Sequence, residues 1–399
     1  MNLVEVHILQ PVPPANLNRD DVGSPKDAWF GGFPRARISS QAQKRAVRQY
    51  FSNLELLSPE DRAVRTRKLI EQELVRRFPH RPPEEVKGVA VAALHAIGLD
   101  VDKSNYHTEY LLFLGRREID ALEQTLHEHW NTLLEHWNTL LAAEVEEKQK
   151  GKKGKGKNDK KDVAQEKVPE AVRKALDSIL KGGRAVDIAL FGRMLADRPE
   201  LGVEAACQVA HAISTHRVDR EFDFYTAVDD LAPREEAGAG MMGEVEYYTA
   251  TFYRYANVNL NLLVRNLQED RDLAVRGVEA FLRGFILTLP SGKQNTFAAH
   301  SPPKFVGLIV QENGMPRNLA AGFEKPVRPA EGKSLTGVSV ETLTRYWAEL
   351  DRAYGAPTRQ WVALVNLSDG ELQHHADKKH DTIEDAIKAA MSGVRALLV

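Results

Sequence analysis

The sequence opens with MNLVEVHILQPVPP (residues 1–14), in which apolar and polar side chains alternate. In an extended chain, side chains two positions apart point to the same side. Val4, Val6 and Ile8 therefore share one side, and Glu5 lies on the other. This period of two predicts a β-strand that starts almost at the first residue. We expect the rest of the chain to supply a sheet around this strand.

The composition and the apolar runs exclude several classes of protein. Hydrophobic residues make up 43% of the 399 residues, which is enough for an ordinary globular core, and the length suits two or three domains. The first strand contains Glu5 and has no basic leader, so it does not have the pattern of a signal peptide. No apolar run approaches the ~18 residues that cross a bilayer. We therefore expect a cytoplasmic protein with no membrane partner.

Cys207 is the only cysteine, which rules out an intrachain disulfide and a zinc site of the CxxC type. It lies in GVEAACQVAHAI (residues 202–213), whose apolar spacing favours a helix with a small buried residue. The sequence shows no Ser-His-Asp order, no P-loop and no GxGxxG motif. We therefore predict that the protein is not an enzyme and needs no cofactor.

The second half of the chain alternates predicted strands with predicted helices. Three short apolar runs have the length and composition of strands: AVDIALFG (185–192), KFVGLIVQEN (304–313) and RQWVALVNL (359–367). Three longer segments repeat apolar residues at helical spacing: 271–289, 339–355 and 382–398. Strand and helix units that follow a leading strand predict an α+β fold with a ferredoxin-like sheet.

Residues 54–182 are predicted to be mostly helical and to be inserted into the sheet domain, which then comprises residues 1–53 and 183–399. Amphipathic helices are expected over 58–78 and 82–98. The motif EHWNTLL occurs twice in tandem, and its period of seven predicts one long helix with both tryptophans on one side.

The inserted region contains a tract of lysine and glycine, KQKGKKGKGKNDKKD (residues 148–162), which has no apolar residue. Such a tract cannot bury any surface, so it is predicted to be a disordered surface loop. A solvated insertion and a polycationic arm are both open interpretations of it.

Two segments, REFDFYTAVDDL and EVEYYTATFYRYANVNL, are predicted to form the arms of a hairpin over residues 220–258. Arms of about eight residues at ~3.3 Å each would reach ~25 Å, enough to project beyond a domain surface. Met241 and Met242 are expected in the glycine-rich turn at its tip, and Tyr225 at its base. Such groups could enter between nucleotide bases or dock on another protein. Both interpretations make the hairpin an interaction element.

A basic stretch stands out because the chain as a whole is nearly neutral, with 54 Lys and Arg against 56 Asp and Glu. FGGFPRARISSQAQKRAVRQ (residues 30–49) carries five positive charges and no acid between Pro34 and Arg48. It predicts a helix with Ser40 as its N-cap and Gln43 at the capping-box position. One face of this helix then carries polar and basic residues: Gln41, Lys44, Arg45 and Arg48.

The start of this helix has the features of a phosphate-binding site. Free amide groups and the helix dipole favour anions, and Ser39 and Ser40 add neutral donors. Arg35 and Arg37 approach the same strip from the preceding segment. The pattern favours contacts to successive phosphates of a nucleic acid, with a solvated helix face or an acidic protein partner as the alternatives.

Two groups of residues resemble metal sites. Asp20, Asp21 and Asp27 could hold a metal for phosphodiester cleavage, which would make the protein a metal-dependent ribonuclease, but the same acids can cap turns or pair with nearby cations. The structural role is the favoured one. The second group lies in a lysine-rich stretch that favours a solvated loop, and it comprises His374, His375, His380 and Asp381. We therefore predict no metal site.

Several ordered motifs within residues 1–300 also carry a family resemblance. They are LNRDD, PKDAWFGG, RARISSQAQKRAVR, VDIALFGRM, AHAISTHRVD, FYTAVDDL, FYRYANVNL and SGKQNTFAAH. Together they resemble the CasC family, the backbone subunits of type I-E CRISPR Cascade complexes. The resemblance implies a hand-shaped protein with an RRM-like palm, helical fingers and a protruding thumb hairpin.

The resemblance also implies a function. Copies of such a subunit stack head to tail along a CRISPR RNA, next to other Cascade subunits, and hold the guide for pairing with target DNA. The thumb of one copy kinks the guide on its neighbour. The subunit itself is not catalytic.

By motif, the resemblance assigns residues to this role. The RNA-backbone groove would be lined by Arg19, Lys26, Arg37, Ser40, Gln41, Lys44, Arg45 and Arg48. Residues packing against bases would be Met194 and Tyr225, the latter where the family pattern has phenylalanine. The thumb wedge would be Met241 or Met242, and a further RNA-facing segment would hold Lys293 and Gln294.

Overall fold

The computed structural model describes residues 1–150, 168–181, 184–195, 198–227 and 241–398. In it the chain forms two compact units. The first comprises Met1–Leu56, Cys207–Leu263 and Arg271–Val399, and the second Leu57–Ala206 and Val264–Asp270. The observed division differs from the predicted boundary after residue 182, because the stretch up to residue 206 belongs to the second unit. The predicted Lys/Gly loop lies outside the described residues from position 151 onward.

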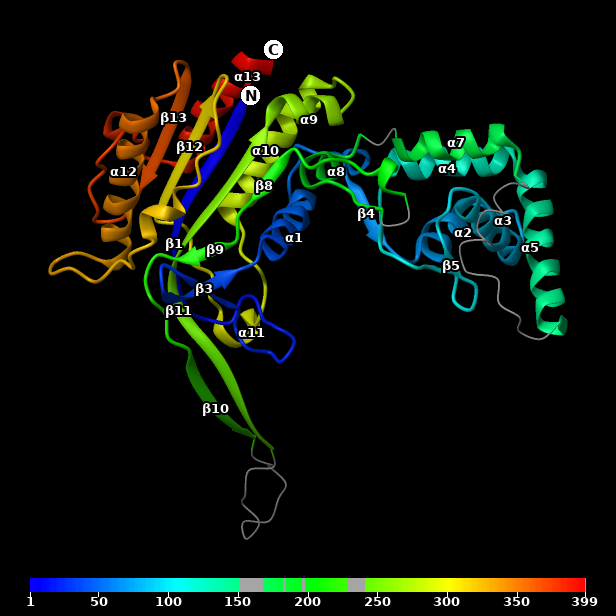
Figure 1. Ribbon diagram of the computed structural model, residues 1–399, viewed down its shortest axis with the longest axis horizontal. Coiled ribbons are helices and arrows are strands. Elements are labelled where there is room, and N and C mark those ends of the chain that lie inside the picture. The colour runs from blue at the N-terminus through cyan, green and yellow to red at the C-terminus, as the bar shows by residue number, and fades with distance from the viewer. Residues whose placement is uncertain (151–167, 182–183, 196–197, 228–240, 399) are drawn as a thin grey trace, which may run out of the picture. The chain divides into compact units, whose positions relative to one another are not determined.

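The first unit is built on a nine-stranded antiparallel sheet whose main order is β13-β12-β1-β11-β9-β3-β2 (Figure 1). Its strands are β1 (Leu3–Ala15), β2 (Asp27–Phe30), β3 (Phe33–Ile38), β8 (Cys207–Val209), β9 (Ala212–Ser214), β10 (Glu221–Ala227), β11 (Met241–Asn259), β12 (Phe305–Gln311) and β13 (Gln360–Asn366). The strands expected at the start of the chain, in the hairpin arms and in residues 304–313 and 359–367 are confirmed. The α+β fold is therefore as predicted.

Strand β1 is an interior strand of this sheet. It pairs with β11 on one side and β12 on the other, so that Val6 lies between Ala256 and Leu308. Its first eight residues are all buried, which means that both faces of the strand are covered. The alternation seen in the sequence separates two buried faces, one with Val4, Val6 and Ile8 and the other with Glu5 and His7.

The helices of the first unit cover both faces of the sheet. Helix α12 packs on the face that carries the polar residues of β1, whereas α10 and α13 pack on the other, where Gly393 of α13 lies against Trp361 of β13. These helices are α1 (Ser40–Tyr50), α9 (Leu260–Asn266), α10 (Arg271–Leu287), α11 (Gln294–Phe297), α12 (Leu335–Tyr354) and α13 (Ile383–Leu398). The helices predicted over 271–289, 339–355 and 382–398 are confirmed, with small differences at their ends.

Arg254 of β11 makes several buried hydrogen bonds on the face of the sheet that α10 covers. Only 1% of it is exposed, and burial lowers the pKa of its guanidinium to about 9. The guanidinium donates hydrogen bonds to the side-chain oxygens of Gln10 (2.7 Å) and Gln43 (3.2 Å) and to the carbonyl of Phe285 (2.8 Å). It also lies over the Phe285 ring. One side chain thus connects two strands with helices α1 and α10.

Glu5 and His7 of β1 form a buried network on the α12 face. The hydroxyl of Tyr255 donates to Glu5 (2.6 Å), as do the side chain of Gln311 (2.9 Å) and the amide of Arg317 (2.7 Å). Despite these hydrogen bonds, desolvation raises the pKa of Glu5 to about 7. Burial has the opposite effect on the pKa of His7, which falls to about 3.

The second unit is mainly helical, and two predictions about its secondary structure are wrong. Its elements are β4 (Ala63–Thr66), α2 (Val75–Arg77), α3 (Pro83–Ala96), β5 (Val101–Asp102), β6 (His107–Thr108), β7 (Leu112–Gly115), α4 (Arg116–Glu128), α5 (Trp130–Lys150), α7 (Glu170–Lys181) and α8 (Val186–Phe191). Residues 58–78 are divided between a strand and short helical turns instead of forming one helix, because β4 pairs with β7. The run 185–192 is helix α8 and not a strand.

The core of the second unit includes a buried ion pair. Arg193 donates to Glu118 at 2.8 Å, and both side chains are almost fully enclosed. The predicted long helix is α5, and it places Trp130 in the core and Trp137 directly against Gly88 of α3. No helix within the described residues is long and apolar enough to cross a membrane.

We predict that Arg254→Met lowers the free energy of unfolding by about 2–4 kcal/mol, because Gln10, Gln43 and the Phe285 carbonyl lose their buried donor. Urea unfolding measures this loss. Arg45→Met is the matched control, since Arg45 is exposed on α1 and should stay within about 0.5 kcal/mol of wild type. Equal stability of the two variants would contradict the role of Arg254.

We predict a pH-dependent stability difference between wild type and Glu5→Gln. The folded-state pKa of Glu5 is about 7 and its ordinary value is 4.5, so the folded chain keeps a proton that the unfolded chain releases between these values. Wild type therefore loses stability relative to the variant as pH rises through this window, by up to about 3 kcal/mol. The contribution of His7 runs the other way but is common to both proteins.

The measurement is urea unfolding of both proteins at intervals from pH 4 to pH 8. Gln311 can rotate its amide to accept from the new glutamine, since its side-chain oxygen is buried without a hydrogen-bond partner among the described residues. If the stability difference between the two proteins does not change with pH, folding does not raise the pKa of Glu5 and the prediction is wrong.

Candidate nucleic-acid interface

Helix α1 begins with a cap that differs from the predicted one. Its N-cap is Ser39, whose hydroxyl accepts a hydrogen bond from the amide of Ala42 (3.3 Å), so the prediction of Ser40 as the cap is wrong by one residue. The amide of Ser39 donates to the side chain of Asn18 (2.8 Å), which ties the helix to the preceding loop. The first turn contains no acidic residue. Its amide groups and its dipole therefore favour an anion.

Gln43, predicted as part of a capping box, orients the helix instead. Its side chain is buried, donates to the carbonyl of Ala210 (2.9 Å) and accepts from Arg254. Val47 is buried on the same side of the helix. The face turned away from the sheet carries exposed or half-buried side chains: Gln41, Lys44, Arg45 and Arg48.

Two cations from the loop and from β3 lie beside a histidine of the segment before β9. Arg37 contacts Nδ1 of His211 at 3.0 Å and donates to the carbonyl of Asp27 (2.9 Å). Burial lowers the pKa of His211, and the positive charges of Arg37 and Lys26 lower it further. Arg19 is exposed in the same loop. Positive charge from separate segments is thus gathered at one place.

The segment that carries Lys293 and Gln294 packs against the same loop. A Cβ atom at Gly292 would lie 2.3 Å from the carbonyl oxygen of Leu17, so only glycine allows this approach. Lys293 has φ of 51°, which turns the chain into the short helix α11. The side-chain oxygen of Gln294 is buried and has no hydrogen-bond partner among the described residues.

One apolar cluster supports all of these segments. It joins Leu17 of the loop, Ile38 of β3 and Ala212 of β9, with Ala42 of α1 and Phe297 of α11 packed against it. Because the segments share this support, their polar residues lie around one apolar cluster of the first unit. We call this region the α1 surface, and it comprises Arg19, Lys26, Arg37, Ser40, Gln41, Lys44, Arg45, Arg48, Lys293 and Gln294.

Arg35 does not belong to the α1 surface, although the sequence suggested that it approaches it. Its side chain is fully buried, and its guanidinium donates to the carbonyls of Ser214 (2.9 Å), Phe323 (2.7 Å) and Glu324 (3.1 Å). Burial lowers the pKa of Arg35. Arg35 and Arg37 lie two positions apart on β3 and so point to the same side of the strand, but Arg35 is buried whereas Arg37 is only half-buried.

Two of the three loop carboxylates are engaged in structural contacts. Asp20 accepts hydrogen bonds from the amides of Val22 (3.1 Å) and Ser24 (2.9 Å), which closes a turn. Asp27 forms an ion pair with Arg220 at 2.7 Å. Asp21, Asp20 and Asp27 do not form a group of three potential metal ligands in the described part of the chain.

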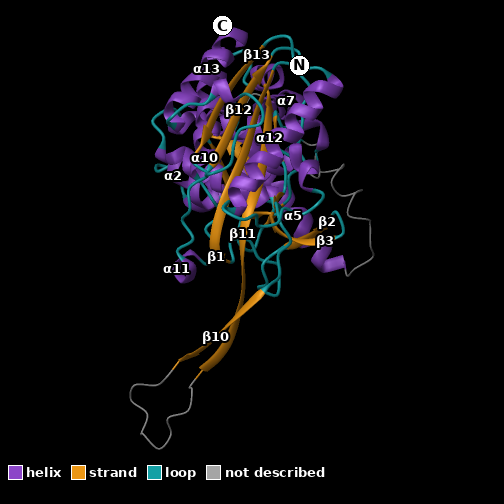
Figure 2. Cartoon of the chain, turned by 90° about the vertical axis from the view of Figure 1, so that its left-hand side faces the viewer, coloured by secondary structure: helices purple, strands orange, loops and turns teal. Residues whose placement is uncertain are grey.

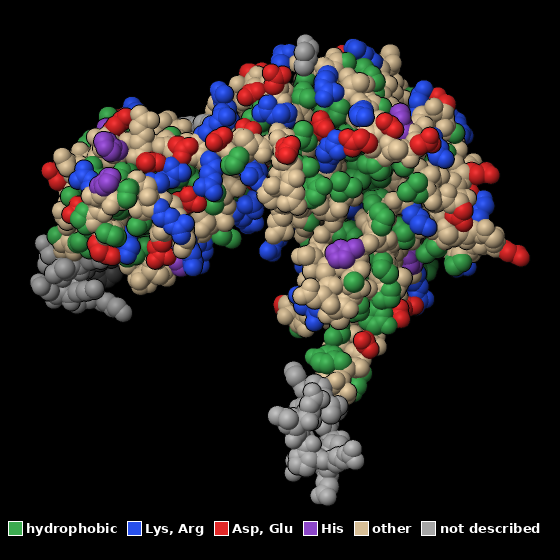
Figure 3. Space-filling view, turned by 180° about the vertical axis from the view of Figure 1, so that it is seen from behind, with side chains coloured by type: hydrophobic (Ala, Val, Ile, Leu, Met, Phe, Trp, Pro, Cys, Tyr) green, Lys and Arg blue, Asp and Glu red, His purple; other side chains and the backbone are tan. Residues whose placement is uncertain are grey.

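The hairpin formed by β10 and β11 extends from the sheet as a two-stranded ribbon (Figure 2). Phe222 and Phe224 point to one side of it and are 59% and 62% exposed, opposite Glu246 and Glu244. Tyr225 lies on the other side, where its ring sits over Gly243. Hydrophobic side chains are visible along this ribbon (Figure 3).

The three predicted methionines lie in two different environments. Met194 is 87% exposed and belongs to the second unit, directly after the buried Arg193. Met241 and Met242 were predicted in the turn, but their backbone opens strand β11 and pairs with Ala227 and Thr226. Their side chains, and the turn itself, lie outside the described residues.

Sequence reasoning missed several residues at or near these surfaces. His211 meets Arg37 only because β9 pairs with β3. Trp29 is 77% exposed on the short strand β2, and a tryptophan in a stretch rich in Gly, Pro, Asn and Asp was a usable signal. The alternation of Phe222 and Phe224 with acidic residues was also visible in the sequence and indicated an apolar ribbon edge.

Comparison with known proteins adds to this geometry. The chain is 31% identical to a chain of a solved "CRISPR RNA-guided surveillance complex, pre-nicking", with a TM-score of 0.78 over 98% of this chain and 100% of that one. A chain of another "CRISPR RNA-guided surveillance complex" is 27% identical, with a TM-score of 0.69 over 98% and 99%. No curated protein matches. A family model described as "CT1975-like protein" matches residues 4–389, so the chain belongs to the CT1975-like protein family.

Proposed function

We propose that this chain is a CRISPR RNA-binding backbone subunit of a type I-E Cascade complex that acts in the cytoplasm. Copies stack head to tail along the guide RNA, hold its phosphate backbone and kink it at intervals. Other Cascade subunits complete the complex, and target DNA is read by pairing with the guide. The similarity to chains of two surveillance complexes supports this proposal. The observation that carries it is the α1 surface.

The α1 surface suits a polyanion better than a single anion. Lys44 and Arg48 are one turn apart on α1, which separates them by ~6 Å along the helix axis. Arg37 and Lys26 extend the positive charge beyond the helix start. Charges spread in this way match consecutive phosphates of a strand. They carry no sequence information, which is appropriate for a subunit that must hold any guide.

Neutral groups on the same surface suit RNA in particular. Gln294 is half-buried beside the loop, and a ribose 2′-hydroxyl can form a hydrogen bond with a side-chain amide. Ser40 and Gln41 add donors beside the start of α1. These polar groups would position the backbone while the cations supply most of the affinity.

The β10–β11 ribbon would make the contact with the neighbouring copy. It presents Phe222 and Phe224 on one side and Tyr225 on the other, and aromatic rings stack on bases for ~1–3 kcal/mol each. Met241 or Met242 at the end of the ribbon, and Met194, would pack at the kink. A surface that binds a different surface on the next copy produces an open filament.

We propose that the subunit is not catalytic. The alternative, a metal-dependent ribonuclease, would use Asp20, Asp21 or Asp27. The contacts of Asp20 with two loop amides and of Asp27 with Arg220 give these carboxylates structural roles and support the non-catalytic proposal.

We predict that Lys44→Glu with Arg48→Glu weakens RNA binding about tenfold or more, to a similar extent for unrelated guide sequences. Each lost phosphate contact should also make the dependence of log affinity on log salt shallower by about 0.7 units for a single strand. Filter binding at several salt concentrations measures both effects.

Co-expression of the wild-type chain with a CRISPR array and the partner subunits should yield complexes that contain a defined small RNA.

The control is Lys388→Glu with Arg395→Glu, which makes the same change in charge on exposed positions of α13 in the same unit. This variant should bind RNA nearly as wild type does. Equal losses in the two double variants would mean that net charge and not the α1 surface governs binding, and a purified complex free of RNA would favour an acidic protein partner.

We predict that Phe222→Ser with Phe224→Ser prevents cooperative assembly on long RNA but preserves binding of one chain to a short RNA. Both rings are exposed, so the fold should keep its stability within about 0.5 kcal/mol. Mass photometry on RNAs of increasing length counts the bound copies. Tyr354→Ser with Leu367→Ser removes two other exposed apolar side chains of the same unit and should assemble normally. Unchanged assembly of the phenylalanine variant would exclude the ribbon as the contact.

A further inference from the structure

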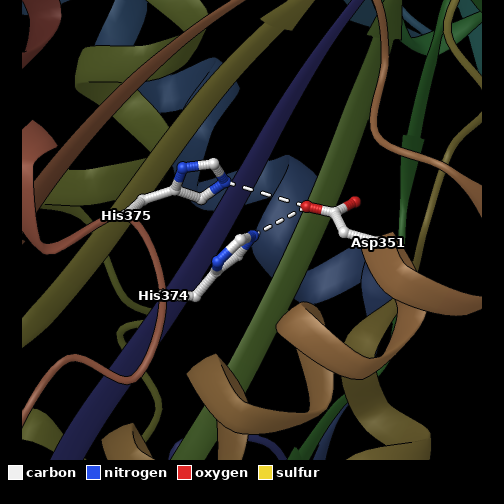
Figure 4. A group of neighbouring side chains, drawn as sticks. All are labelled: Asp351, His374 and His375. Atoms are coloured by element: carbon white, nitrogen blue, oxygen red, sulfur yellow. Dashed lines mark hydrogen bonds and ion pairs between the residues drawn. The ribbon is translucent and has the colours of Figure 1, made fainter.

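Three side chains from separate parts of the first unit converge beside α12 (Figure 4). Asp351 lies in the last turn of α12, and His374 and His375 lie in the loop between β13 and α13. Nε2 of His374 is 2.7 Å from Oδ2 of Asp351, and Nε2 of His375 is 3.8 Å from the same atom. The three potential ligand atoms all lie within 4.8 Å of one another.

The backbone at the histidines brings their rings to the same side. His375 has φ of 54°, a left-handed conformation that few residues other than glycine adopt. Adjacent side chains of an extended chain would point apart, but here the two ring centroids are 3.7 Å apart. The ring of Trp347 packs against both histidines and closes one side of the group.

Asp351 is held so that one oxygen remains for the histidines. Its Oδ1 accepts from Arg317 at 2.5 Å, and the same guanidinium donates to the carbonyl of Gly355 (2.6 Å). Its Oδ2 faces both imidazoles. Carboxylate ligands of metals are commonly oriented by a second hydrogen bond of this kind.

The environment of the His375 ring favours a ligand at its Nε2 atom. Its Nε2 is buried and makes no hydrogen bond within the described residues. A buried polar atom without a partner is costly, because it has lost its interaction with water. This atom points toward the carboxylate oxygen that His374 already contacts (Figure 4).

We propose that Asp351, His374 and His375 bind a divalent transition metal ion, with Zn²⁺ as the expected ion. Two imidazole nitrogens and one carboxylate oxygen are a common zinc ligand set, with water in the fourth position. Tetrahedral ligands at 2.0–2.1 Å from zinc lie ~3.3 Å apart, so small rotations of the side chains would suffice. The ion would connect the end of α12 to the loop that precedes α13.

This group differs from the one suggested by the sequence. His380 is not a member, and its amide donates to the carbonyl of Leu364. Asp381 is not a member either. Asp351 was missed because it lies on a helix more than twenty residues earlier in the chain, and only the fold brings it to the two histidines.

The test uses the full chain, first treated with EDTA and then titrated with Co²⁺, which gives visible absorption when it is bound by nitrogen and oxygen ligands. We expect one Co²⁺ per chain, and displacement by Zn²⁺. Zn²⁺ at a hundredfold excess over its dissociation constant should raise the midpoint of thermal unfolding by about 5 °C. His374→Gln and His375→Gln should each lose the absorption and the thermal shift.

His380→Gln is the matched control, since it removes a histidine of the same loop that lies outside the group, and it should behave as wild type. Circular dichroism in EDTA checks that the variants fold. Absence of both signals in wild type overturns the proposal without any variant. So does an absorption that survives in both variants, or that is lost to the same extent in His380→Gln. RNA binding should not change, because the α1 surface is not involved.

Discussion

The buried guanidinium of Arg254 is the constraint on which the arrangement of the first unit depends. A cation without water must find acceptors, and the acceptors of Arg254 come from β1, α1 and α10. These elements therefore have one arrangement that satisfies the charge. In that arrangement Gln43 faces inward, so the basic residues of α1 face outward. The position of the α1 surface follows from a contact in the core.

Other buried polar side chains also need partners within the core. On the α12 face, Glu5 and His7 are enclosed and take their partners from β11, β12 and the segment around Arg317. In the second unit, Arg193 pairs with Glu118. A shift of β1 by one residue would move Glu5 and His7 to the opposite face, away from these partners, so the contacts also specify its register.

Local charge, and not net charge, supports the proposal that this chain holds a nucleic acid. The chain has a formal net charge of −2, yet several short segments place their cations around one apolar cluster. Acidic residues are used elsewhere, for example opposite the exposed phenylalanines of the β10–β11 ribbon. A chain with this distribution has the charge needed for the proposed contact with a phosphate backbone and also has acidic surfaces elsewhere.

The sequence by itself determined the elements whose period is local: β1, the hairpin arms, the three long helices of the second half and the basic face of α1. The predictions for two short apolar runs are wrong: 185–192 is helical and not a strand, and the stretch at Cys207 is a strand and not a helix. A buried helix and a buried strand of that length look alike in sequence. Only the tertiary structure separated Arg35 from Arg37, moved the cap to Ser39 and brought Asp351 to the histidines. These outcomes depend on which distant groups compete for a buried partner, and that is settled when the chain packs.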